Sequence, residues 1–158
     1  MVKKQTESLQ DLMSVVNSAE IGLVILDKHS NIRVWNLFMV NHSGLSADSV
    51  INKNLFDQFP DIPKQWFNDK AQQCILKKQK LLSTWQERPY LFEFKNVRSR
   101  SKSAIFMYQN ITFIPLASAN GEIENFAIMI TDVTDIAVST QQHDAVVDEY
   151  SKKLDQDK

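Results

Sequence analysis

The stretch GLVILDKHSNIRVWN, residues 22–36, is the part of the chain that decides its fold. Residues 21–26 form a nearly continuous apolar run, which is typical of a buried strand. The next residues, Asp27 to Asn31, are polar and include side chains that bond to their own backbone in turns. Residues 32–36 then alternate between apolar and polar side chains, as a half-buried strand does. The stretch therefore predicts an antiparallel hairpin with a short polar turn.

Helical patterns follow this hairpin. Phe38, Asn41 and His42 lie at helical spacing, and Gly44 stands where a helix commonly ends. Residues 64–80 place their apolar side chains on one face, which predicts a longer amphipathic helix. A helical region is therefore expected to separate the first hairpin from the rest of the chain.

Three further strands are predicted in the second half of the chain. Residues 85–95 have the aromatic composition of a strand, and 106–116 and 126–133 are long apolar segments. The pair Asn120-Gly121 predicts a tight turn between the last two strands. Two hairpins on either side of a helical region indicate an α+β fold, with a five-stranded antiparallel sheet and helices on one face.

Both ends of the chain are predicted to be helical. Residues 7–17 carry an apolar stripe at positions i, i+3, i+4 and i+7, made by Leu9, Leu12, Met13 and Val16. This helix covers either the core of its own domain or the same helix of a second copy, as a dimer interface. Residues 136–155 show a weak heptad pattern. We expect an N-terminal dimerisation or capping helix over 1–17, a core over 18–135 and a C-terminal helix over 136–158.

Composition excludes several classes of protein. The chain has 158 residues, enough for one ordinary domain, with 18 basic and 19 acidic side chains. A net charge of −1 argues against nucleic-acid binding, and the basic residues at 98–102 are better explained as a solvated loop than as a site for an anionic partner. Three glycines cannot build a phosphate-binding loop, and three widely spaced histidines predict no metal site. The single cysteine and the lack of a signal peptide or membrane-spanning segment predict a cytoplasmic protein.

Four segments, taken in this order, resemble a PAS domain: GLVILDKHSNIRVWN (22–36), VINKNLFD (50–57), the strand and turn over 111–121, and the last strand over 126–134. The resemblance covers about residues 18–135. It implies the PAS fold, flanked by N- and C-terminal helices. Asp132 and Thr134 match the family's D-x-T sequence before a signalling helix, which implies that they tie the last strand to that helix.

A narrower resemblance involves two other segments. WQERPYLFEF (85–94) and MYQNITFIPL (107–116) resemble the PAS modules that precede GGDEF-type diguanylate cyclase domains in some gammaproteobacteria. The chain itself contains no GGDEF-like catalytic sequence. It is then either a free-standing PAS protein or the sensory part of a longer one.

Two cofactor classes of the family do not fit the sequence. The flavin-binding branch needs a reactive cysteine in an N-C-R-F-like sequence, and KNLF at 53–56 places Leu55 at that position. The haem-binding branch often uses a histidine on the long helix, and 64–80 contains none. His42 lies on an earlier helix and could face the cavity, but it is better explained as a solvated or satisfied side chain, and Cys74 as a small core residue. The cofactor stays unknown, and a small organic molecule is the candidate ligand.

Alternation along the strands predicts which side chains face the helices. Those expected to line a ligand cavity are Gln109, Ile111, Phe113, Ile128 and Ile130, together with the aromatic residues Trp35, Trp66, Trp85 and Tyr90. An aromatic set of this kind also suits an ordinary core. The amide of Gln109 needs a partner in either case, which a backbone group, a water molecule or a ligand can supply.

The resemblance implies a non-catalytic sensory and dimerisation module. The sequence contains no recognisable pair of nucleophile and base that would indicate a catalytic site instead. A ligand in the cavity would shift the packing of the terminal helices in a homodimer. The C-terminal helix would then pass the signal to an output domain or a partner protein, in cyclic-di-GMP or two-component signalling. The alternative is a pure interaction module whose cavity is filled by its own side chains.

Overall fold

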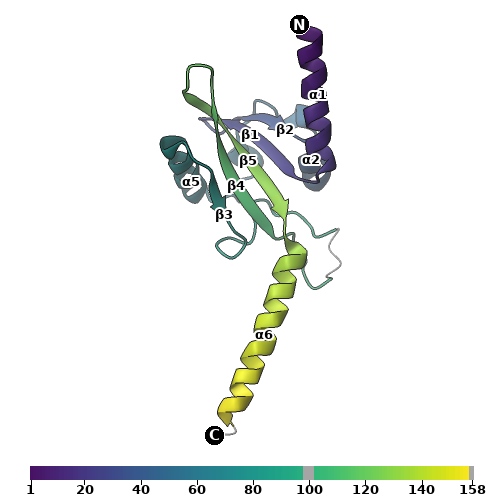
Figure 1. Ribbon diagram of the computed structural model, residues 1–158, viewed down its shortest axis with the longest axis vertical. Coiled ribbons are helices and arrows are strands. Elements are labelled where there is room, and N and C mark those ends of the chain that lie inside the picture. Colours follow the sequence, from purple (N-terminus) through teal and green to yellow (C-terminus); the bar gives the residue numbers. More distant parts are fainter. Residues whose placement is uncertain (98–101, 157–158) are drawn as a thin grey trace.

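The structure is a computed structural model that describes residues 1–97 and 102–156 (Figure 1). In chain order its elements are α1 (Val2–Ser18), β1 (Gly22–Asp27), β2 (Ile32–Trp35), α2 (Leu37–Ser43), α3 (Ala47–Val50), α4 (Leu55–Gln58), α5 (Lys64–Lys77), β3 (Leu81–Ser83), β4 (Gln109–Ala117), β5 (Ile123–Asp132) and α6 (Thr134–Gln156). The first hairpin, the last hairpin and both terminal helices that the sequence predicts are present.

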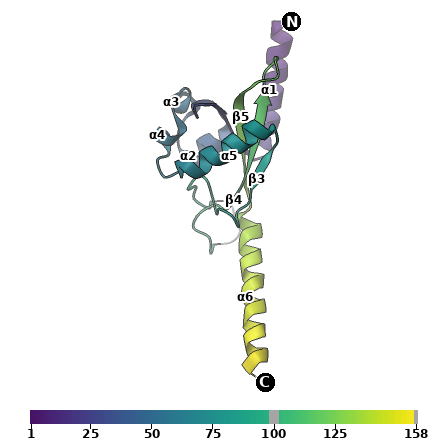
Figure 2. The same cartoon turned by 90° about the vertical axis from the view of Figure 1, so that its left-hand side faces the viewer.

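The five strands form one antiparallel sheet in the order β2-β1-β5-β4-β3. The longest pairing joins β4 to β5, from Gln109 opposite Asp132 to Ala117 opposite Ile123. The predicted Asn-Gly turn connects these two strands, with Gly121 at a φ of 82°, a conformation that suits glycine. Helices α2 to α5 lie on one face of the sheet (Figure 2). This arrangement confirms the predicted α+β fold.

The core lies between this helical layer and the sheet. The inward side chains of the central strands are buried, namely Val24, Leu26, Ile111, Phe113, Phe126, Ile128 and Ile130. From α5, the ring of Phe67 packs against those of Phe113 and Phe126, with centroids 5.4 and 6.2 Å away. Burying one such side chain contributes about 1.5–3 kcal/mol, so this layer is the main source of stability.

Asn36 fixes the junction between β2 and α2. Its side-chain oxygen accepts hydrogen bonds from the backbone N–H groups of Met39, at 3.3 Å, and Leu23, at 3.0 Å. Its amide donates to the carbonyl oxygen of Ile21 at 2.8 Å. The same side chain therefore caps α2 and binds it to β1. Gly22 permits this close approach, because a Cβ atom there would lie 2.9 Å from the sulfur of Met39.

Asp27 organises the turn between β1 and β2. Its carboxylate accepts hydrogen bonds from the backbone N–H groups of His29 and Asn31, and it pairs with Arg33 at 2.8 Å. Burial acts to raise the pKa of Asp27, but the hydrogen bonds from Asn31, His29 and Arg33 outweigh it and lower the pKa. The carboxylate is therefore ionised at neutral pH, and its hydrogen bonds hold the turn together.

The prediction of a strand over residues 85–95 is wrong. The third strand is β3, which pairs with β4, while 85–95 is an irregular segment with one isolated bridge from Lys95 to Phe106. Its buried side chains include Phe92 and Phe94, which pack with the helical layer. The aromatic composition that predicted a strand here serves packing, and β-propensity does not separate the two roles.

Two boundaries also differ from the predicted ones. α5 ends at Lys77, three residues before the expected end at Lys80, because Lys78 adopts a left-handed conformation with a φ of 52°. β4 begins at Gln109, three residues after the expected start at Phe106. The predicted polar loop at 98–102 falls mostly outside the described residues.

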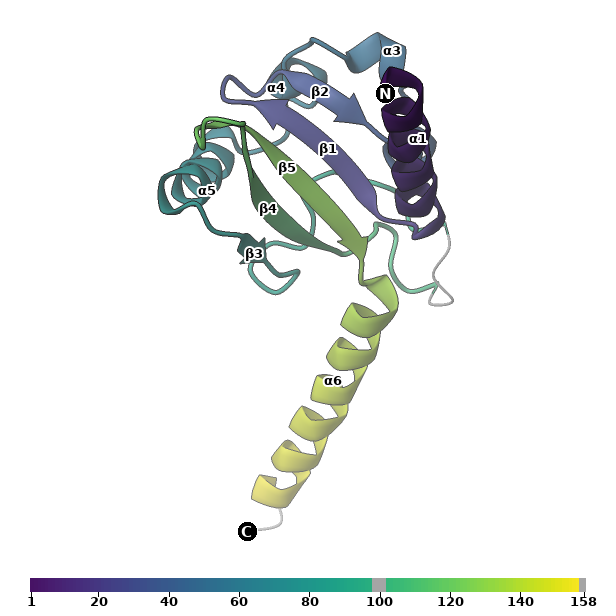
Figure 3. The same ribbon diagram turned by 45° about the horizontal axis from the view of Figure 1, so that its top comes forward.

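The terminal helices project from opposite ends of the core (Figures 1 and 3). No side chain of α1 is buried; Leu9 and Leu12 are each 61% exposed, while Met13 and Val16 are half-buried. The buried residues of α6 lie in its first turns and are Thr134, Ala137 and Val138. Within residues 1–97 and 102–156, no helix combines the length and apolarity needed to cross a membrane.

Candidate functional site

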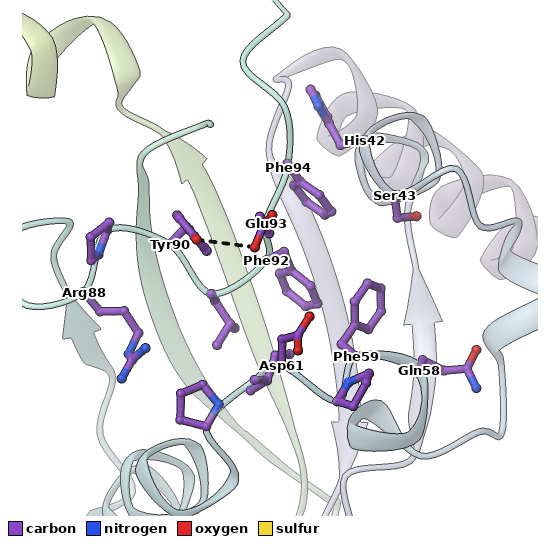
Figure 4. A pocket seen from close by; sticks show the side chains of 15 residues that line it. His42, Ser43, Gln58, Phe59, Asp61, Arg88, Tyr90, Phe92, Glu93 and Phe94 are labelled. Atoms are coloured by element: carbon purple, nitrogen blue, oxygen red, sulfur yellow. Dashed lines mark hydrogen bonds between the residues drawn. The ribbon is translucent and has the colours of Figure 1, made fainter. Parts of the chain in front are cut away.

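A pocket of about 560 Å³ lies between the end of α2, the connection from α4 to α5, and the irregular segment that follows β3 (Figure 4). Its lining residues are His42, Ser43, 58–63 and 88–94. We call 88–94 the pocket wall, because this segment forms one complete side of the pocket. A partly apolar pocket of this size with a few polar groups suits a small organic molecule.

Aromatic side chains form the apolar part of the pocket. Phe59 lies between Trp35 and Phe92, with ring centroids 5.6 and 4.9 Å away. Phe92 stacks on Phe94 at 5.3 Å, and the imidazole of His42 stacks on Phe94 at 5.6 Å. The pocket rings come from α2, the α4–α5 connection and the pocket wall, while Trp35 of β2 supports Phe59 from the core. The pocket therefore joins segments that are distant in the sequence.

Charged and polar side chains stand around this aromatic surface. The Tyr90 hydroxyl lies 3.5 Å from the Glu93 carboxylate. Burial raises the pKa of Tyr90, and the negative charges of Glu93 and Asp61 raise it further, so the phenol stays protonated at neutral pH. The guanidinium of Arg88 stacks on the ring of Trp66 at 4.6 Å. Its buried Nε has no hydrogen-bond partner among the described residues.

A salt bridge holds the start of the segment on α5. The ammonium of Lys70 lies 2.6 Å from the Glu87 carboxylate and 5.8 Å from the ring of Trp66. The hydrogen bond from Lys70 is the main cause of a lowered pKa at Glu87. Together with Arg88, this pair anchors the residues before the pocket wall on the side of α5.

Gln109, at the start of β4, holds the pocket wall from behind. Its side-chain oxygen accepts hydrogen bonds from the backbone N–H groups of Leu91, at 3.0 Å, and Phe92, at 3.2 Å. Its amide donates to the carbonyl oxygen of Phe92 at 2.7 Å. Gln109 is fully buried, so its amide finds its partners in the protein backbone. One side chain thus replaces the ladder of hydrogen bonds that a strand here would have made.

The structure distributes the residues predicted to line a cavity over three places. Packed in the core are Trp35, Gln109, Ile111, Phe113, Ile128 and Ile130. Tyr90 lines the pocket, and Trp66 lies beside it under Arg88. Trp85 packs against Tyr108 with ring centroids 5.6 Å apart, away from this pocket.

Several pocket residues were missed by sequence reasoning. Phe59, Asp61 and Arg88 line the pocket, but they lie in irregular segments that carry no periodic pattern. Pro60 and Pro63 in the sequence indicate only that regular structure is interrupted here. Such breaks show where a helix ends and do not show what the following residues contact.

Asp132 and Thr134 connect the sheet to α6. The Thr134 hydroxyl donates to the Asp132 carboxylate at 2.6 Å and accepts from the backbone N–H of Tyr108 at 3.0 Å. The backbone N–H of Thr134 also donates to Asp132, at 3.0 Å. Two turns further along α6, the amide of Gln141 donates to the Tyr108 hydroxyl at 3.2 Å. Both ends of Tyr108 are therefore bound to α6.

The chemistry of other candidate groups is limited. Burial raises the pKa of the Cys74 thiol, which disfavours the reactive thiolate. Leu55, which the resemblance aligns with the cysteine of the flavin-binding branch, is buried in the core. Within the described residues, no three histidine, cysteine or acidic side chains gather as a metal site would require.

The sequence signature described as the PAS fold matches residues 10–133. The chain belongs to the PAS family. PAS domains are generally non-catalytic sensory modules, and the five-stranded sheet with its helical layer is their architecture. No curated protein resembles the chain closely enough to count as a match.

Solved PAS structures have the same fold. A sensory box sensor histidine kinase from Vibrio cholerae is 22% identical, with a TM-score of 0.60, over 84% of this chain and 98% of that one. The PAS domain of histidine kinase ThkA is 24% identical, with a TM-score of 0.51, over 71% of this chain and 98% of that one. The PAS domain of Bordetella pertussis BvgS is 12% identical, with a TM-score of 0.58, over 90% and 98%.

Proposed function

We propose that the chain is a cytoplasmic, non-catalytic sensory and dimerisation module. A small organic molecule binds the pocket, and the C-terminal helix α6 relays the change to an output domain or a partner protein. The proposal needs a pocket, a moving wall and a connection from that wall to α6. Membership of the PAS family supports the sensory role, and the contacts of β4 support the relay.

Gln109, the first residue of β4, and Tyr108, the residue just before the strand, carry this proposal. Gln109 binds the backbone of the pocket wall through three hydrogen bonds. Tyr108, the residue before it, is bound to Thr134 and Gln141 at the start of α6. A shift of the wall therefore reaches α6 over one peptide unit. A ligand biases this element only if it binds its two arrangements with different affinities.

Two kinds of output fit the module. The sequence resembles PAS modules that precede diguanylate cyclases, which favours cyclic-di-GMP signalling. The solved structures with this fold include PAS domains of histidine kinases, and one of them is ThkA in complex with the response regulator TrrA. That finding favours two-component signalling, in which α6 would continue into a kinase or contact one.

A homodimer through α1 is the second part of the proposal. The stripe Leu9, Leu12, Met13 and Val16 lies exposed or half-exposed along this helix. α6 also leaves apolar side chains in solvent, including Val146, Tyr150 and Leu154. Exposed apolar surface of this extent is typical of an interface, and two-fold pairing would bring both pairs of terminal helices together.

A second candidate function is a dimerisation module that binds no ligand. The observation in its favour is the filled interior: most residues expected to line a cavity pack in the core, and the Gln109 amide is satisfied by the backbone. In this case the pocket would hold only water, and the wall would have no bound state to report.

Native mass spectrometry of freshly purified protein separates the two functions. We expect a dimer that carries a defined extra mass, which Asp61→Trp removes because an indole fills the pocket. Asp57→Trp, an exposed acid outside the pocket, is the matched control and should keep the extra mass. A dimer of bare polypeptide would favour the ligand-free module.

The dimer has its own test in the same spectra. Leu9→Glu with Leu12→Glu should give monomers, because charges would then lie in the apolar stripe. Gln10→Glu with Ser14→Glu changes the same helix outside the stripe and should leave the dimer intact. Monomers in the wild-type protein would contradict the proposed interface.

A further inference from the structure

A second pocket, of about 400 Å³, lies between the β1–β2 turn and α5. Figure 3 shows this turn and α5 on the same side of the molecule. None of its lining residues lines the first pocket. It is lined by Lys28, His29, Ser30, Asn54, Phe56, Lys64, Asn68, Ala71, Gln72, Ile75 and Phe126. No acidic side chain belongs to this set.

Hydrogen-bond donors face the pocket from both sides. Lys64, Asn68 and Gln72 follow each other at intervals of four residues on α5, so they form one stripe along the helix. Lys28 and His29 lie opposite, in the β1–β2 turn. The helix and the turn together surround the pocket with cationic and neutral donors.

Among the described residues, neither lysine of the pocket is paired with an acidic side chain. Neither Lys28 nor Lys64 forms a salt bridge within the described part of the chain; Lys64 lies over the ring of Phe56, 5.5 Å from its centroid. Asp27, the neighbouring acid, is committed to Arg33 and to the turn. Both ammonium groups are therefore free to bind an anion.

Ser30 is the most informative residue of this pocket. It is only 6% exposed as a residue, but its hydroxyl is not one of the fully enclosed polar atoms without a partner, which within the described residues are Ser83 Oγ and Arg88 Nε. The hydroxyl is therefore open to the pocket that Ser30 lines, where it can donate a hydrogen bond to an acceptor. The backbone of Ser30 also has a φ of 65°, a left-handed conformation that residues other than glycine rarely adopt.

The other hairpin turn shows what a purely structural residue looks like at this position. In the β4–β5 turn, the N–H of Gly121 donates to Ser118, as that of Ser30 donates to Asp27 in the β1–β2 turn. The matching position there is a glycine, at a φ of 82°. Glycine avoids the strain that Ser30 accepts. A function for the Ser30 side chain would explain why a serine stands here.

We propose that this second pocket binds a small organic anion. The carboxylate or phosphate group of the ligand is held by Lys28, Lys64 and the Ser30 hydroxyl. Its apolar part lies against Ile75 and Phe126, which form the inner side of the pocket with Phe56 and Ala71. The site therefore favours an anion with a compact apolar body over inorganic phosphate.

A titration of the full chain, followed by NMR of its backbone amides, tests the site. The probes are benzoate, phenyl phosphate, inorganic phosphate and the neutral analogue benzyl alcohol. We expect benzoate or phenyl phosphate to shift the resonances of 28–30 and 64–75 saturably, and to bind more tightly than the other two. The stronger of the two anions identifies the acid group. Equal binding of benzyl alcohol, or no binding of either anion at millimolar concentration, would overturn the proposal.

Paired variants test the cations. Lys28→Gln with Lys64→Gln should weaken binding of the better anion about five-fold, which is the size expected for two exposed charges. Lys77→Gln with Lys80→Gln removes the same charge outside the pocket and should leave the affinity unchanged. Equal affinities for the two double variants would contradict the assignment of Lys28 and Lys64.

Ser30→Gly separates binding from folding. We expect the melting temperature to rise, because glycine relieves the left-handed conformation, while the affinity for the anion falls. A structural role alone would not move the two measurements in opposite directions. An unchanged affinity would exclude the hydroxyl from the site.

Discussion

The core and the pocket wall are held in place by different forces. In the core, rings such as those of Phe67 and Phe113 pack on many neighbours, and no single polar group is needed. The pocket wall, 88–94, depends on a few polar contacts, above all the three hydrogen bonds of Gln109 and the stacking of Arg88. We therefore expect the wall to open at a lower free energy than the core.

The largest effect should come from the core. Phe67→Ala is expected to lower the free energy of unfolding by about 3–5 kcal/mol, because Phe67 is fully buried and its removal leaves a cavity. Leu76→Ala on the same helix is the control; Leu76 is 76% exposed and should matter by less than about 0.5 kcal/mol. Urea denaturation measures the free energy of unfolding of both variants. A similar loss in the two would contradict the expected difference between a core position and an exposed one.

The sequence predicted the core side of this comparison well. Period-two alternation identified Ile111, Phe113, Ile128 and Ile130 as inward-facing, and all four are buried. The hairpin and the five-stranded sheet also followed from local patterns, because alternation records which face of a strand is buried.

The pocket wall could not be predicted in the same way. Apolar and polar residues follow no regular spacing in the wall. The position of its backbone depends instead on hydrogen bonds to Gln109, a residue distant in the sequence. The wall's aromatic residues therefore suggested a strand. Ser30 was assigned to a turn, but nothing in the sequence indicated that this serine would be a mostly buried residue at a positive φ beside a pocket.

A smaller effect should appear where β4 meets α6. Thr134→Val keeps the shape of the side chain but removes the hydroxyl that joins Asp132 to the backbone of Tyr108. We expect a loss of about 1–2 kcal/mol, together with earlier fraying of α6 on heating, because a buried N–H loses its partner. Thr140→Val is the control, since its hydroxyl bonds within α6. Circular dichroism measures both variants, and identical melting would contradict the role of Thr134.

The smallest effect concerns the anchor of the wall on α5. The pKa of Glu87 is lower in the folded state, chiefly because of Lys70, so the ion pair stabilises the fold above the unfolded pKa of about 4.3. This stabilisation is lost as the pH falls through the folded pKa. Because the pair is partly exposed, we expect less than about 1 kcal/mol. Glu87→Gln should remove that part of the pH dependence, and an unchanged profile between pH 6 and 3 would contradict the contribution of the pair.

Hydrogen exchange of the Gln109→Leu variant tests the central proposal most directly. The substitution leaves the N–H groups of Leu91 and Phe92 without partners, so the pocket wall should lose protection. If β4 links the wall to α6, residues 134–141 should lose protection too, while the β1–β2 hairpin keeps its own. Phe113→Leu, on the same strand and face, controls for general destabilisation and should not single out these two segments. Loss of protection confined to the wall would contradict the relay through β4.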